Sequence, residues 1–325
     1  MAQVKLTELS EIPFLDVGNI QGRLILSLTF YVKGDWSMWI PTDKGIQKIK
    51  GWPAEAFYFG DTPELGTDIY FHFLDFLTQR ASFASIQKPL RGLNDDFFNL
   101  SASLAKLDLL YKKRDEVKAG VSRMVSTEIE YIFSVCRSIF DLLQEIIAQL
   151  WTTVRLVDEK AKKQFLPETF SKATALLQKN SRSDCLVEKY GLPSQLAEFY
   201  IRNFQFFSSL REFRDNVAHR GSSVDTIFST ERGFAVHDSQ APFSEYGVWT
   251  EEHKKANGLC SLRPAIGHVI HQTLAACEDF SRTIESIILF PPPIAPGLHL
   301  YMRGYFNEHL IKNVEAINKS KWWDD

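Results

Sequence analysis

The feature that most constrains the fold is a long stretch of helical periodicity in the middle of the chain. From residue 122 to about residue 157, apolar side chains recur at the spacing of one helix face. They are Met124, Val125, Ile129, Ile132, Phe133, Cys136, Phe140, Leu143, Ile147, Leu150 and Trp151. A helix of this length is typical of the central helix of a bundle. Two further long helices are predicted, one beginning near Pro193-Ser194 and one over about 262–289.

The first part of the chain has a strand-like pattern instead. Between residue 21 and about residue 59, apolar positions alternate with the positions between them, and turn residues such as Gly34-Asp35 interrupt the pattern. We therefore expect a short antiparallel meander. After Gly66 the spacing becomes helical, and an apolar stripe predicts a helix up to about Ser82.

These patterns together predict an α+β chain that is mostly α. A loop at about 89–94, which contains Pro89 and two other turn-forming residues, marks the expected domain boundary. We expect a β-rich module with one helix at residues 1–90 and a helical bundle at 91–290. Residues 291–325 are expected to form a C-terminal extension that packs back on the body.

Two segments inside the bundle are not predicted as long helices. Residues 157–192 have the pattern of a connecting insertion with a short helix from Pro167 to Lys179. Residues 226–230 and 233–237 favour a β-hairpin that directly follows the helix beginning near Pro193.

The end of that helix carries the most informative residues of the chain, Arg214-Asp215-Asn216-Val217-Ala218-His219. Because each residue turns a helix by about 100°, Arg214 and His219 diverge by about 140° and cannot meet within one unbroken helix. Two copies facing each other could bring them together. Asp215 lies one turn before His219, so its carboxylate can hold the imidazole N–H and fix the tautomer.

An arginine and a histidine at this position suit chemistry at a phosphodiester. His219 lies near a helix C-terminus, where the helix dipole favours the imidazolium form. A histidine can gain or lose a proton near pH 7, and the Arg214 guanidinium is always charged. The histidine can therefore move protons in a transesterification, while the arginine steadies negative charge on the phosphoryl oxygens. This chemistry points to RNA.

Arg214-Asp215, three residues and His219 resemble the R-[polar]-x(3)-H signature of the HEPN superfamily, a group of helical domains that includes many metal-independent ribonucleases. The resemblance covers roughly residues 95–290. It implies a HEPN-like helical bundle in which the motif residues of two protomers build one active site in a homodimer. It also implies that Arg214 and His219 are the catalytic pair and that Asp215 occupies the polar position. No metal or cofactor is implied.

Members of such families often place a further polar group from an early helix near the arginine and histidine. Arg137 and Asp141, four residues apart on the predicted central helix, are therefore our second pair of site candidates. A structural ion pair is the alternative interpretation, because such pairs are common on helices. Arg211 and Arg220 are candidates for RNA binding, and with Arg202 and Arg214 they could form a basic patch.

Three other interpretations remain open. The basic residues of the motif could be cations stabilised at a helix C-terminus, with Asp215 and His219 as a surface pair. The aromatic residues of the N-terminal module could form a base-stacking platform or fill its core; they are Trp36, Trp39, Trp52, Phe57, Tyr58 and Phe59. His268 and His271 could hold a metal, although their spacing is not a recognised one.

Composition limits the class of protein. The net charge is −3 and the pI about 6.3, so any contact with RNA must be local. The chain has neither an apolar stretch long enough to span a membrane nor a signal-peptide core, and we expect a cytoplasmic protein without membrane contact. Its four cysteines have no paired spacing, which favours reduced thiols over a disulfide frame or a zinc site. Phosphate-loop, nucleophile-elbow and dinucleotide motifs are absent.

Two functions follow. The first is a metal-independent endoribonuclease, such as a toxin or an antiviral defence effector, with an antitoxin or regulatory protein as a possible partner. His219 would be the general acid or base and Arg214 would stabilise phosphoryl charge. The second is a HEPN-like module that binds RNA, a nucleotide or a protein without catalysis. The near-neutral charge favours the second function, and the intact motif favours the first.

Overall fold

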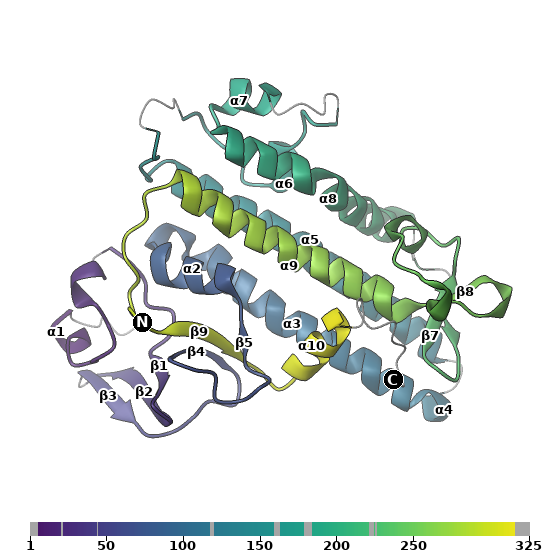
Figure 1. The fold of residues 1–325 in the computed structure, drawn as a ribbon, viewed down its shortest axis with the longest axis horizontal. Helices are drawn as coiled ribbons and strands as arrows, with labels where there is room; N and C mark the ends of the chain where they lie inside the picture. The colour runs from purple at the N-terminus through teal and green to yellow at the C-terminus, as the bar shows by residue number, and fades with distance from the viewer. Residues whose placement is uncertain are drawn as a thin grey trace.

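The computed structural model describes residues 6–20, 22–43, 45–117, 120–158, 163–178, 184–220, 224 and 226–315, apart from the side chains of Leu6 and residues 218–220. Four long helices dominate it and lie side by side in Figure 1. They are α3 (Gln87–Lys112), α5 (Val121–Trp151), α8 (Ser194–Arg220) and α9 (Leu262–Ile287). The α+β, mostly helical class is confirmed.

The remaining helices are short and connect or flank these four. The α-helices are α1 (Leu6–Leu9), α2 (His72–Arg80), α4 (Arg114–Val117), α6 (Phe170–Ala173), α7 (Asp184–Tyr190) and α10 (Asn307–Glu315). The 3-10 helices are η1 (Val17–Asn19), η2 (Ala84–Ile86), η4 (Phe243–Tyr246), η5 (Glu251–His253) and η6 (Ala256–Gly258). No helix in the described ranges is long and apolar enough to cross a membrane.

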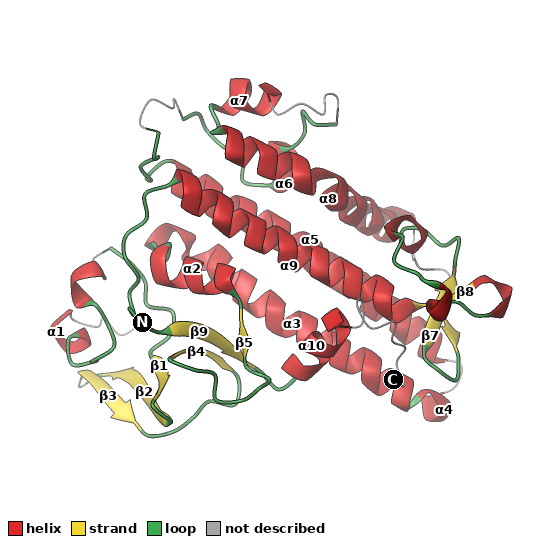
Figure 2. Cartoon of the chain, in the orientation of Figure 1, coloured by secondary structure: helices red, strands yellow, loops and turns green. Residues whose placement is uncertain are grey.

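A six-stranded sheet lies beside one end of the helices, as the yellow strands at the lower left of Figure 2 show. Its order is β3-β2-β1-β4-β9-β5. The strands are β1 (Thr29–Val32), β2 (Asp35–Thr42), β3 (Gly45–Ile49), β4 (Ala56–Gly60), β5 (Ile69–Tyr70) and β9 (His299–Arg303). The C-terminal strand β9 lies antiparallel between β4 and β5, so the sheet combines the two ends of the chain.

Strands between residues 21 and 59 and a turn at Gly34 are confirmed, although β1 begins only at Thr29 and Asp35 already belongs to β2, but the expectation of a simple antiparallel meander is wrong. Lys33 and Gly34 have φ values of 54° and 82°, the left-handed conformations that a two-residue hairpin between β1 and β2 requires. β4, however, pairs with β1 in parallel through Phe30 and Phe59. Alternation along a strand reveals its two faces and not the direction of its neighbour, so the sequence could not distinguish these arrangements.

The expectation of a loop at 89–94 is also wrong, because these residues lie within α3. Pro89 is in the first turn of the helix, where its missing N–H leaves no helical hydrogen bond unmade. Gly92 serves a helix contact: a Cβ atom there would lie 3.1 Å from Leu142 Cδ2 of α5. Both residues are thus compatible with a continuous helix that packs closely on α5.

Several helices are shorter in the structure than the sequence predicted. α5 ends at Trp151 and not near residue 157, and the helix expected over 167–179 is reduced to the one turn of α6. Ile69, expected in a helix, belongs to strand β5. The start of α8 at Ser194 and the long helix α9 agree with the prediction.

A second, three-stranded sheet follows α8. The predicted hairpin forms from β6 (Phe228–Ser229) and β7 (Phe234–His237), and β8 (Leu259–Ser261) pairs with β7 as a further strand that the sequence did not indicate. This sheet lies at the far end of the bundle from the six-stranded sheet (Figure 1).

Most of the N-terminal aromatic residues pack inside the protein. Tyr58 and Phe59 are fully buried, and Phe57 contacts Phe98 of α3 with ring centroids 5.2 Å apart. Trp52 alone of the six is largely exposed, at 61%, and the guanidinium of Arg303 lies 5.2 Å from its ring. These contacts favour the core-filling interpretation over a base-stacking platform.

Candidate functional site

The motif residues lie at the end of α8, which continues as one helix from Ser194 to Arg220. Arg214 and His219 therefore share one regular helix, and the angle of about 140° between their directions applies. The side chains of His219 and Arg220 lie outside the described residues, and so does the expected contact between Asp215 and His219. Arg214 is described, and its side chain is 47% exposed.

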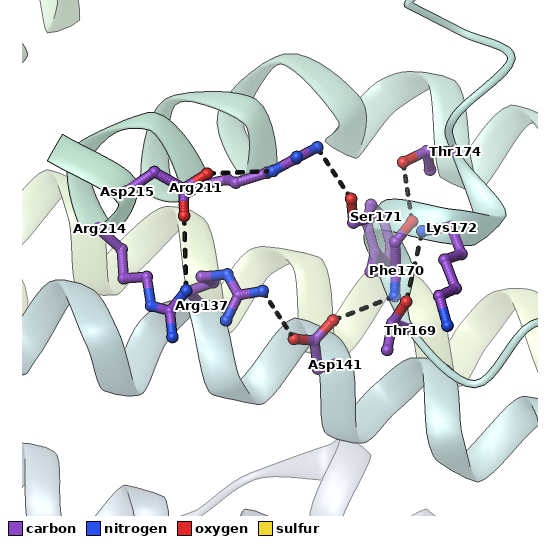
Figure 3. Close-up of polar contacts among 10 residues, drawn as sticks. All are labelled: Arg137, Asp141, Thr169, Phe170, Ser171, Lys172, Thr174, Arg211, Arg214 and Asp215. Atoms are coloured by element: carbon purple, nitrogen blue, oxygen red, sulfur yellow. Dashed lines mark hydrogen bonds and ion pairs between the residues drawn. The ribbon is translucent and has the colours of Figure 1, made fainter. Parts of the chain in front are cut away.

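Asp215 pairs with two arginines of its own helix. Its Oδ1 lies 3.4 Å from Nη1 of Arg214, and its Oδ2 lies 3.4 Å from Nε of Arg211. Arg211 also donates a hydrogen bond from Nη1 to Oγ of Ser171 (2.9 Å), a residue of α6 (Figure 3). The carboxylate thus fixes the orientation of both guanidinium groups at the end of α8.

The second pair of candidates forms the expected ion pair on α5. Nη2 of Arg137 lies 3.3 Å from Oδ2 of Asp141, and both side chains are about three-quarters buried. The backbone N–H of Phe170 donates to Asp141 Oδ1 (3.1 Å), so this carboxylate also holds the first turn of α6. Asp141 therefore has a structural role, whereas Nε of Arg137 is buried without a hydrogen-bond partner in the described part of the chain.

Ring contacts between α5 and α8 place the ion pair of α5 at the same height along the two helices as the ion pairs of Asp215 on α8. The rings of Phe133 and Phe213 stack at 4.0 Å, and those of Phe140 and Phe207 are 5.6 Å apart, so the two helices run antiparallel. Arg137 lies midway between the two phenylalanines of α5. Figure 3 shows Arg137 and Arg214 on the facing helices, with the Arg137 guanidinium directed at Asp141 and the Arg214 guanidinium at Asp215.

Arg137, Arg211 and Arg214 are named here the arginine cluster. Two carboxylates, Asp141 and Asp215, accompany these three cations, which leaves one positive charge in excess. Guanidinium groups bind phosphoryl oxygens through paired N–H donors, so the cluster has the chemistry to bind a phosphodiester.

The basic patch expected along α8 is smaller than the sequence indicated. Arg202 does not join the arginine cluster, because it pairs with Asp279 of α9 through Nη2 (2.7 Å) and Nε (3.1 Å). Ser171, by contrast, is a neighbour of the cluster that sequence reasoning missed. It lies in the connecting insertion, where no periodic pattern or motif marks it.

A metal site and a nucleophilic cysteine have weaker support. Within the described ranges, no three His, Cys, Asp or Glu side chains are grouped so that they could hold a metal. His268 instead lies against Tyr246, with ring centroids 5.0 Å apart. Cys136, Cys260 and Cys277 are buried free thiols, and burial raises the pKa of each. For Cys136 the pKa rises to about 12, so the nucleophilic thiolate is disfavoured there.

Comparisons of the chain with protein-family models, curated proteins and solved structures gave no match. The function is therefore inferred from the residues of the site and from the motif.

Proposed function

We propose that the protein is a metal-independent endoribonuclease of the HEPN type, active as a homodimer. The observation that carries this proposal is the arginine cluster at the end of α8, the helix that holds the Arg-Asp-x(3)-His motif. Arg214 is half exposed and accessible to a substrate, and its guanidinium is paired with Asp215. A second guanidinium from α5, that of Arg137, supports the same phosphate-binding chemistry.

The reaction is an internal transesterification. His219, as general base, removes the proton of a ribose 2′-hydroxyl, and the 2′-oxygen attacks the adjacent phosphorus. The bond from phosphorus to the 5′-oxygen breaks, a general acid protonates that oxygen, and a 2′,3′-cyclic phosphate remains. Arg214 stabilises the additional negative charge on the phosphoryl oxygens during the attack. Because Arg214 and His219 diverge on one helix, the histidine acts with the arginine of the other subunit.

One observation favours a second candidate function, a binding module without catalysis. In the single chain, Asp215 forms ion pairs with both Arg211 and Arg214, which reduces the positive charge presented to RNA. A module of this kind would bind RNA, a nucleotide or a protein partner and leave RNA intact.

Incubation of the purified protein with RNA in excess EDTA distinguishes the two functions. The ribonuclease proposal predicts fragments that end in 2′,3′-cyclic phosphate, since no step of the transesterification needs a metal ion. The fragments are identified by mass spectrometry, and an electrophoretic shift assay measures binding in parallel. Binding of RNA without any cleavage would support the binding module and contradict the nuclease.

A further inference from the structure

A solvent-open groove of about 810 Å³ lies on a different side of α8 from the arginine cluster. Its walls are α8, the 3-10 helix η4 and α9. The residues that matter for its chemistry are Phe206, Glu212, Glu245, Tyr246 and His268. None of them belongs to the proposed nuclease site.

The charges in the groove are negative. Glu212 and Glu245 are exposed and have no ion-pair partner among the described residues. The cation at the groove's edge, Arg202, is already paired with Asp279 of α9. Burial and the nearby His271 lower the pKa of His268, which disfavours a positive charge on its imidazole. The groove therefore attracts cations.

Aromatic rings complete the chemistry of the groove. Tyr246 lies tilted on His268, and burial raises the pKa of its phenol, which keeps it uncharged. The half-buried Phe206 adds a further ring to the lining, whereas Phe213 is buried and stacks on Phe133 of α5. Aromatic faces bind cations, and guanidinium groups in particular stack on them.

We propose that the groove binds the guanidinium group of an arginine side chain from a partner protein. The planar guanidinium can stack on an aromatic ring while its N–H groups donate to a carboxylate, which a lysine ammonium does less well. The groove is also larger than one side chain needs. Gln205, Asn216 and Gln272 line the rest of it with neutral amides, which can pair with the backbone of an extended peptide.

The test uses the full-length protein and three peptides that differ at one residue. Acetyl-Gly-Gly-Xaa-Gly-Gly-amide is prepared with arginine, lysine or citrulline, which has the shape of arginine without its charge. Isothermal titration calorimetry is expected to show the tightest binding for the arginine peptide and about tenfold or greater weakening for citrulline. Binding of the arginine peptide should also weaken as NaCl is added.

Variants locate the binding in the groove. The double variant Glu212→Gln, Glu245→Gln is expected to weaken binding of the arginine peptide about tenfold or more, because both charge-assisted contacts are lost. Glu285→Gln, an exposed carboxylate of α9 outside the groove, is the matched control and should bind as the wild type does. Thermal unfolding confirms that each variant is folded.

Three results would overturn the proposal: no binding of the arginine peptide at millimolar concentration, equal binding of arginine and citrulline, or unchanged binding in the double variant. Because RNA is absent from these titrations, they succeed or fail independently of the ribonuclease proposal.

Discussion

Replacement of His219 by alanine is expected to lower the rate of RNA cleavage by about 10²–10⁴-fold, the usual contribution of a positioned acid or base. The side chain would be lost as general base, while the arginine cluster would remain to bind phosphate. RNA binding should therefore change little. Single-turnover cleavage in EDTA measures the rate, and an electrophoretic shift assay measures the binding.

Arg214→Ala removes the guanidinium that the proposal assigns to the phosphoryl oxygens, and a loss of about 10²–10³-fold in rate is expected. Its side chain is 47% exposed, so the fold should tolerate the change. Arg282→Ala is the matched control, because Arg282 is 70% exposed on α9 and, within the described ranges, pairs with Glu278, four residues before it. Contaminating ribonucleases also act in EDTA, so all variants are purified identically. A rate for Arg214→Ala equal to the rates of Arg282→Ala and the wild type would refute the assignment.

Phe133→Ala is expected to lower the free energy of unfolding by about 3–5 kcal/mol, as large truncations in a packed core do. The ring of Phe133 stacks on that of Phe213 at 4.0 Å and meets the edge of Phe243 at 5.9 Å. Phe213 directly precedes Arg214, so this stack anchors the end of α8 against α5. Urea denaturation followed by far-ultraviolet circular dichroism measures the change.

Met124→Ala on the same helix is the control for this truncation. Met124 is 48% exposed, and its removal should change the free energy of unfolding by no more than about 0.5 kcal/mol. If Phe133→Ala were as mild as Met124→Ala, the Phe133–Phe213 stack would not be what holds the two helices together.

Local patterns were sufficient to predict three of the four long helices, whereas α3 was missed because Pro89 and Gly92 were interpreted as a loop. The apolar stripes of α5, α8 and α9 have the helical period over many turns, and Pro193-Ser194 marks the start of α8 correctly. The hairpin of β6 and β7 follows from two short strand-like runs around Gly233. In each case the residues that determine the element are neighbours in the sequence.

Contacts between distant segments could not be predicted in this way. The strand β9 enters the sheet from the far end of the chain, and Gly92 lies inside a helix where it packs closely against Leu142 of α5. In the site, the ion pair of Arg137 and Asp141 was predicted from its four-residue spacing. The contact between Arg211 and Ser171 depends on how the insertion folds back over α8, which no local pattern reveals.

A mixing experiment tests the shared active site most directly. Arg214→Ala and His219→Ala subunits carry different affinity tags and are combined so that mixed dimers can be purified through both tags. Such a dimer retains one histidine and one arginine on different chains. The proposed composite site predicts that it cleaves RNA far faster than either variant alone. Mixed dimers that are as inactive as the two parent variants, beside an active wild type, would contradict it.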